Sequence, residues 1–101
     1  GTESTTYGTT LVYTRDMFTT NTVPPYSDPE GDAALNLKIT SLPTIGILKY
    51  NSVAVTINQV VSFADIDLGL LVYVPNNATT TTYNDIFSFE IADAGSGIFV
   101  G

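Results

Sequence analysis

The stretch "LNLKIT", residues 35–40, alternates apolar and polar side chains at every position. Successive side chains of a strand point to opposite faces of a sheet, so Leu35, Leu37 and Ile39 are expected on one buried face. The stretch "FSFEIA", residues 87–92, repeats the same period of two. These two segments predict strands that each bury one face.

Further short runs have the composition of strands, because valine, isoleucine, tyrosine and threonine pack well on a pleated surface. They are "TTLVYT", "GILKY", "VAVTI", "QVVSF" and "LLVYV". Turn signals separate them at Pro43 to Gly46, Asn51-Ser52, Asn58-Gln59, Asp67 to Gly69 and Pro75 to Asn77. About seven short strands at this spacing predict an all-β fold, either a β-sandwich or a barrel.

The inward positions of these strands define an expected core. Its members are Leu37, Ile39, Leu48, Val55, Phe63, Leu71, Tyr73, Phe87, Phe89 and Ile91. We expect residues 1–8, which are polar and lack a pattern, to be a disordered tail, and residues 9–101 to form a single domain.

One segment has helical signals. In "SFADIDLG", residues 62–69, Ser62 and Asp65 have the spacing of a capping box, and Gly69 can take the left-handed conformation that ends a helix. We therefore expect one short helical turn near 63–68. In that turn Asp65 and Asp67 are expected to cap the helix or face solvent rather than bind a metal.

Composition excludes several classes of function. The 101 residues contain three basic and ten acidic side chains, a formal net charge of -7 that repels phosphate groups and argues against nucleic acid and anionic lipid. No apolar run approaches the roughly 20 residues that span a bilayer, so membrane insertion is not expected. Histidine and cysteine are absent, which removes the usual zinc ligands and the usual general base, and we expect no enzymatic activity.

The segment "SDPEGD", residues 27–32, concentrates carboxylates at Asp28, Glu30 and Asp32. Calcium takes six to eight oxygen ligands, so these side chains, completed by Asp16 or a backbone carbonyl, predict a weak calcium site. The spacing does not fit an EF-hand, because the glycine stands fourth rather than sixth. The alternative is a plain β-turn, in which the proline presets φ and the glycine takes a positive φ.

The six tyrosines suggest a second alternative. Aromatic side chains on a surface can stack against sugar rings, and Tyr26 and Tyr83 lie in predicted loops, with Tyr7 near the start of the chain. A contiguous exposed patch of these tyrosines would favour a carbohydrate-binding module. Tyr50 and Tyr73 are in phase with buried leucines and are expected in the core.

The order of several motifs resembles a known class of domain. The D-P-x-G-D turn, "ITSLPTIGILKYNSVAV", "VVSFADIDLGLLVYVP" and "FSFEIAD", within residues 13–93, are similar to the cadherin-like tandem-repeat domains of large secreted or surface-attached bacterial proteins. The resemblance implies an antiparallel immunoglobulin-like or cadherin-like β-sandwich that is one repeat of a larger extracellular protein. Only "AGSGIFVG" follows Asp93, so the last strand is expected to be short.

The resemblance also implies a role. Such domains act in adhesion or matrix contact, often with calcium, and their partners are the neighbouring repeats of the same chain and a surface glycan or protein. The expected function is therefore a non-catalytic structural or adhesive module, secreted or on the cell surface, with the carbohydrate-binding module as the alternative.

Overall fold

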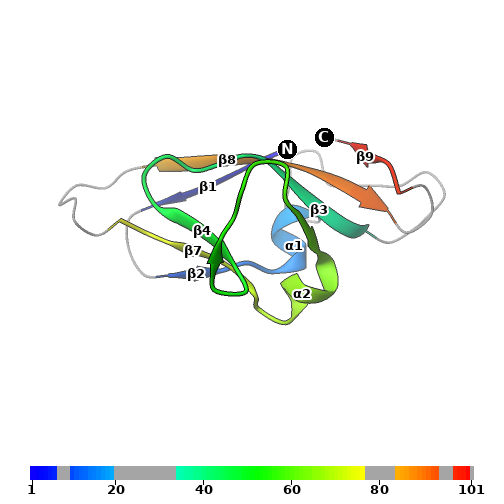
Figure 1. Cartoon of the computed structure of the whole chain (residues 1–101), viewed down its shortest axis with the longest axis horizontal. Helices are drawn as coiled ribbons and strands as arrows, with labels where there is room; N and C mark the ends of the chain where they lie inside the picture. The colour runs from blue at the N-terminus through cyan, green and yellow to red at the C-terminus, as the bar shows by residue number, and fades with distance from the viewer. Residues whose placement is uncertain (7–9, 20–33, 77–83, 94–96, 101) are drawn as a thin grey trace.

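The protein is a β-sandwich whose two sheets pack face to face (Figure 1). The computed structural model describes residues 1–6, 10–19, 34–76, 84–93 and 97–100, and for residues 3–6 the backbone alone. All strand pairings within these ranges are antiparallel. The predicted all-β sandwich is confirmed.

Strands and two short helices follow one another along the described chain. They are β1 (Thr2–Thr6), β2 (Leu11–Val12), α1 (Arg15–Phe18), β3 (Ala34–Ser41), β4 (Ile47–Tyr50), β5 (Val53–Ala54), β6 (Val60–Ser62), α2 (Phe63–Asp67), β7 (Leu71–Val74), β8 (Asn84–Asp93) and β9 (Phe99–Val100).

One sheet has the strand order β1-β8-β3-β6, with β9 also pairing with β8, and the other has the order β2-β7-β4-β5. The seven predicted strands correspond to β2 to β8. The two described strands beyond that number, β1 and β9, come from opposite ends of the chain and both pair with β8. The described residues of β9 are Phe99 and Val100.

The expectation of a disordered tail over residues 1–8 is wrong for Thr2–Thr6. These residues pair in register with β8, from Thr2 opposite Ser88 to Thr6 opposite Asn84. A strand at the edge of a sheet is held by backbone hydrogen bonds, which need no alternation of apolar side chains. The polar sequence therefore carried no signal for it.

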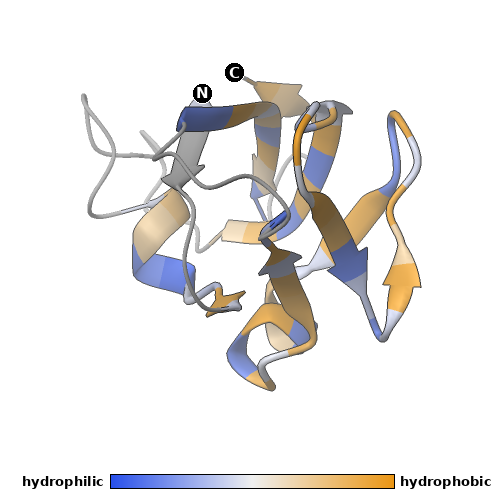
Figure 2. Cartoon of the chain, turned by 90° about the vertical axis from the view of Figure 1, so that its left-hand side faces the viewer, coloured by the Kyte–Doolittle hydropathy of each residue, from blue (hydrophilic) through white to orange (hydrophobic). Residues whose placement is uncertain are grey.

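The predicted core is confirmed, because all ten of its members are buried. Bands of apolar and polar residues alternate along the strands in Figure 2, as the period of two requires. Tyr13, Phe18, Ala34, Val61 and Ile66 complete the buried cluster.

Leu35 is the exception to the predicted faces, since its side chain is 47% exposed. The register of β3 against β8 shifts between Ala34 and Asn36, which marks a β-bulge. One extra residue in a strand moves the preceding side chains to the opposite face. Ala34 is buried in consequence, and Leu35 points outward.

The helix α1 was not predicted. Its four residues carry Phe18, which is fully buried and packs edge-on against the rings of Phe63 and Phe89, at centroid distances of 6.4 and 5.1 Å. Tyr13 and Phe87 lie against the same ring. Within the described part of the chain, α1 and α2 have four and five residues, and no helix is long enough to cross a bilayer.

Replacing Phe18 tests whether α1 closes the core. We expect Phe18→Ala to lower the free energy of unfolding by about 3–5 kcal/mol, because the lost ring leaves a cavity among four aromatic neighbours. Leu68→Ala is the control, since Leu68 is 73% exposed and its truncation should change stability by less than about 0.5 kcal/mol. Urea denaturation measures both, and equal losses would contradict the packing of α1.

Candidate functional site

A buried carboxylate joins the two sheets. Asp85 in β8 is 2% exposed and accepts hydrogen bonds from the backbone N–H groups of Thr44, Ile45 and Gly46, at 2.9, 3.1 and 2.8 Å. The hydroxyl of Tyr73, in β7 of the opposite sheet, donates a fourth at 2.7 Å. We call this group the Asp85 clamp.

The clamp keeps Asp85 charged. Burial is the largest influence and raises the pKa of its carboxyl, but the donors on Gly46, Tyr73, Thr44 and Ile45 together outweigh it, so that the pKa lies below its usual value. Each donor stabilises the anion, and the two oxygens share four of them. The geometry fits a structural anchor, because a carboxylate surrounded by donors is a poor base.

The clamp also explains Gly46. A Cβ atom built on this glycine would lie 2.6 Å from the carbonyl oxygen of Val74, closer than real contacts allow. Only glycine lets the backbone approach both β7 and the carboxylate. The sequence signal that could have revealed the clamp is the position of Asp85, which is in phase with the inward Phe87 and Phe89.

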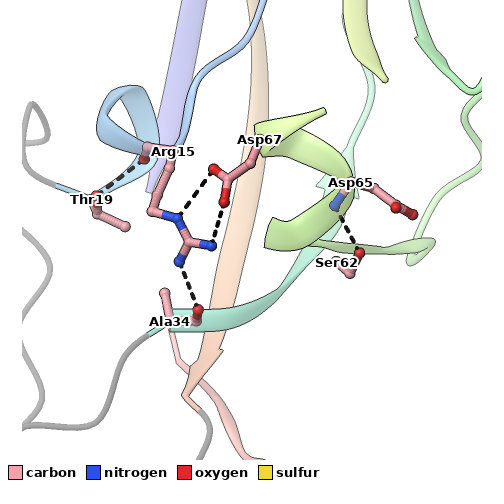
Figure 3. A network of polar contacts seen from close by, with 6 residues as sticks. All are labelled: Arg15, Thr19, Ala34, Ser62, Asp65 and Asp67. Carbon is pink, nitrogen blue, oxygen red and sulfur yellow. Dashed lines mark hydrogen bonds and ion pairs between the residues drawn. The ribbon is translucent and has the colours of Figure 1, made fainter. Parts of the chain in front are cut away.

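A second polar group lies where the two helices meet (Figure 3). The Nε and Nη2 atoms of Arg15 donate to the two carboxylate oxygens of Asp67, at 3.2 and 2.8 Å. Its Nη1 atom donates to the carbonyl oxygen of Ala34 at 3.0 Å, and the guanidinium carbon lies 5.0 Å from the centroid of the Phe63 ring. Arg15 thus ties α1 to α2 and to the start of β3; we call this group the Arg15 fork.

The fork changes the titration of both partners. The hydrogen bond to Asp67 raises the pKa of Arg15, and the same bond lowers the pKa of Asp67 below its usual value. Both side chains are partly exposed, at 36% and 49%, so solvent screens their attraction. Asp67, expected to cap the helix or face solvent, is exposed and also forms this ion pair.

The predicted helical turn is confirmed, with one change in detail. The N–H of Asp65 donates to the Ser62 hydroxyl oxygen at 3.1 Å, and Gly69 has a φ of 78° with its N–H bonded to the carbonyl of Ile66. The carboxylate of Asp65 accepts from the Tyr50 hydroxyl rather than completing the reciprocal cap. That bond raises the pKa of Tyr50.

The predicted calcium residues are described only in part. Asp16 lies in the first turn of α1, exposed and next to Arg15. Asp28, Glu30 and Asp32 lie outside the described residues. Within the ranges that the structure describes, no three acidic, histidine or cysteine side chains gather closely enough to hold a metal ion. The calcium site stays a prediction from the sequence.

The described tyrosines belong to the packing of the domain. Tyr13 and Tyr73 are 1% and 0% exposed, and Tyr50 is half-buried against the core. Tyr26 and Tyr83, on which the carbohydrate-binding alternative depends, lie outside the described residues, as does Tyr7.

Comparison with models of protein families, with curated proteins and with solved structures found no match to this chain. The function must therefore be argued from its own residues.

The Asp85 clamp predicts both a loss of stability and its pH dependence. We expect Asp85→Asn to lower the free energy of unfolding by at least about 2 kcal/mol, because an amide nitrogen would then face buried N–H donors. Asn84→Ala, at the exposed neighbouring position, is the control.

The pH dependence of this loss follows from the lowered pKa. Asp85 stabilises the fold fully above its usual pKa of 3.8, and this contribution is lost as the pH falls through the lower value of the folded state. The difference between the wild type and Asp85→Asn should therefore be constant near pH 7 and shrink below about pH 4. A difference that grows on acidification would contradict the clamp.

The Arg15 fork predicts unequal effects of its two charged partners. Arg15→Gln should lower the melting temperature more than Asp67→Asn, because Arg15 also holds the Ala34 carbonyl and covers Phe63. High salt should reduce the effect of Asp67→Asn more than that of Arg15→Gln. Salt screens the ion pair, but it does not weaken the packing of Arg15 against Phe63. Thermal melts at low and high salt measure both, and equal losses would show that the ion pair alone matters.

Proposed function

We propose that this domain is a non-catalytic structural or adhesive module of the immunoglobulin-like, cadherin-like kind, one repeat of a larger extracellular protein. The β-sandwich supports the proposal, since this architecture recurs in cell-surface modules. The sequence motifs within residues 13–93 support it independently.

One observation carries the proposal. Three of the described carboxylates that could do chemistry are engaged in holding the fold together: Asp85 joins the sheets, Asp67 joins the helices and Asp65 binds Tyr50. A catalytic acid or base instead needs an oxygen free to exchange a proton with a substrate. These polar groups therefore stabilise the fold, which is the role expected in a structural module.

Calcium is the proposed stabilising ion, held by Asp28, Glu30 and Asp32 with Asp16. The Arg15 fork supports the placement of Asp16, because Arg15 bonds the carbonyl of Ala34, the first described residue after the acidic segment. The positive charge of Arg15 is balanced by Asp67, which reduces its repulsion of a cation at this corner.

The carbohydrate-binding alternative depends on Tyr26 and Tyr83 and stays a prediction from the sequence. None of the described tyrosines adds an exposed ring to it, because Tyr13 and Tyr73 are buried and Tyr50 packs on the core.

Thermal melts test the proposed module and its ion together. We expect the isolated domain to unfold in one cooperative transition, and about 10 mM calcium to raise its melting temperature, because extracellular modules bind calcium with Kd values of roughly 10⁻⁴–10⁻³ M. At a hundredfold excess over Kd the gain is about 2.7 kcal/mol. The double variant Asp28→Asn, Asp32→Asn should abolish the gain.

The control is Glu90→Gln, which removes a carboxylate of β8 that is not part of the acidic segment, and should keep the calcium effect. Coincident melts in calcium and in chelator would contradict the calcium site. A broad, non-cooperative transition would contradict a self-sufficient module.

A further inference from the structure

The two ends of the described chain share one edge of β8. β3 pairs with β8 from Ser88 to Asp93 along the other edge, so β1 and β9 must both lie on the edge that remains. Figures 1 and 2 place the start of β1 beside the end of β9.

The registers of β1 and β9 on β8 are continuous. Val100 faces Ile91, and Gly1 faces Phe89, so that Glu90 alone separates the two pairings on β8. In the sequence one residue, 101, follows Val100. If residue 1 of a second copy followed residue 101, it would arrive opposite Phe89, where Gly1 now lies.

The hydrogen-bonding pattern is continuous as well. The N–H and carbonyl of Phe89 both bond to Gly1, at 2.8 Å each, which makes this a hydrogen-bonded pair. Such pairs recur at every second residue of an antiparallel ladder, and Ile91, opposite Val100, is two residues along. A strand running through from β9 would therefore keep both the register and the bonding.

We propose that the edge of β8 from Asn84 to Phe89 is a strand-acceptor site, and that its partner is the β1 segment of a second copy of this chain that follows residue 101. The partner strand enters as a direct extension of β9. This deepens the proposed function by naming the contact between repeats, and it rests on that function in taking the domain to be one of several copies.

Chain connectivity favours the second copy's strand over the chain's own. In the folded domain β1 is joined to β2 of the other sheet through residues 7–10, whereas a strand continuing from β9 reaches the same place through residue 101 alone. The entropic cost of closing a loop grows with its length. The two strands have the same sequence and the same partners, so the shorter loop decides between them.

Two contacts hold β9 in place on the sheet. The ring of Phe99 lies under the ammonium group of Lys38 in β3, with 4.6 Å from Nζ to the ring centroid. The N–H of Gly97 also donates to the carbonyl of Asp93, on the same edge of β8. The direction of β9 is thus fixed before the chain passes Val100.

The first test moves the segment within one chain. Deleting residues 1–6 should lower the melting temperature by roughly 10 °C, and placing the same six residues after residue 101 should restore it. In the moved segment, Glu3→Pro should abolish the rescue, because its N–H faces β8 in the alternating pattern. Ser4→Pro is the matched control, since its N–H faces away and the rescue should survive.

The second test makes two sites compete for one strand. A two-copy chain, with residue 101 joined directly to residue 1 of the second copy, has residues 1–6 deleted from the first copy. Two variants of this chain are compared, and both carry Ser4→Cys in the second copy. One also carries Ile86→Cys in the first copy, and the other carries Ile86→Cys in the second copy. Ser4 and Ile86 face each other in the ladder, and the described chain has no cysteine of its own.

In a redox buffer we expect more than half of the molecules to form the disulfide between copies. We expect less than half of them to form the disulfide within the second copy. The reverse ratio would overturn the proposal. A moved segment that restores no stability, or that restores it equally with Glu3→Pro, would also overturn it. Neither readout depends on calcium or adhesion, so failure here is distinct from failure of the proposed function.

Discussion

The fold depends on the burial of one charged group. Asp85 stands at an inward position of β8, where a carboxylate without partners would be too costly to desolvate. Three consecutive N–H groups from the link between β3 and β4, where the chain crosses from one sheet to the other, and the hydroxyl of Tyr73 satisfy it. The clamp therefore fixes where the sheets meet, and it explains why residue 46 must be glycine.

The two short helices cover the apolar core at the place where the strands end. Phe18 of α1 fills the space among the aromatic rings, and Phe63, the first residue of α2, packs edge-on against it. Helices of this length are unstable alone and need tertiary contacts. The Arg15 fork supplies a polar contact between them, while its guanidinium shields the Phe63 ring from solvent.

The long strand β8 carries the Asp85 clamp and also pairs with the strands at both ends of the described chain. A strand ten residues long exposes backbone donors and acceptors along any edge that is left unpaired, which invites pairing with another chain. On the edge away from β3, β9 pairs with Ile91 and Ala92, and β1 pairs with Asn84 to Ser88. In the proposed repeat protein the same edge accepts a strand from the next module, because backbone pairing fixes register without requiring apolar side chains.

The sequence by itself determined the sandwich class, the ten core residues and the turn at Ser62 to Gly69, because these depend on periodicity and capping that act over a few residues. Only the tertiary structure decided the partners of Asp85 and Arg15, the outward turn of Leu35 at its bulge and the pairing of β1. Asp85 meets Gly46 across 39 residues and Arg15 meets Asp67 across 52. Such contacts follow from how the strands are ordered in space, which no local pattern encodes.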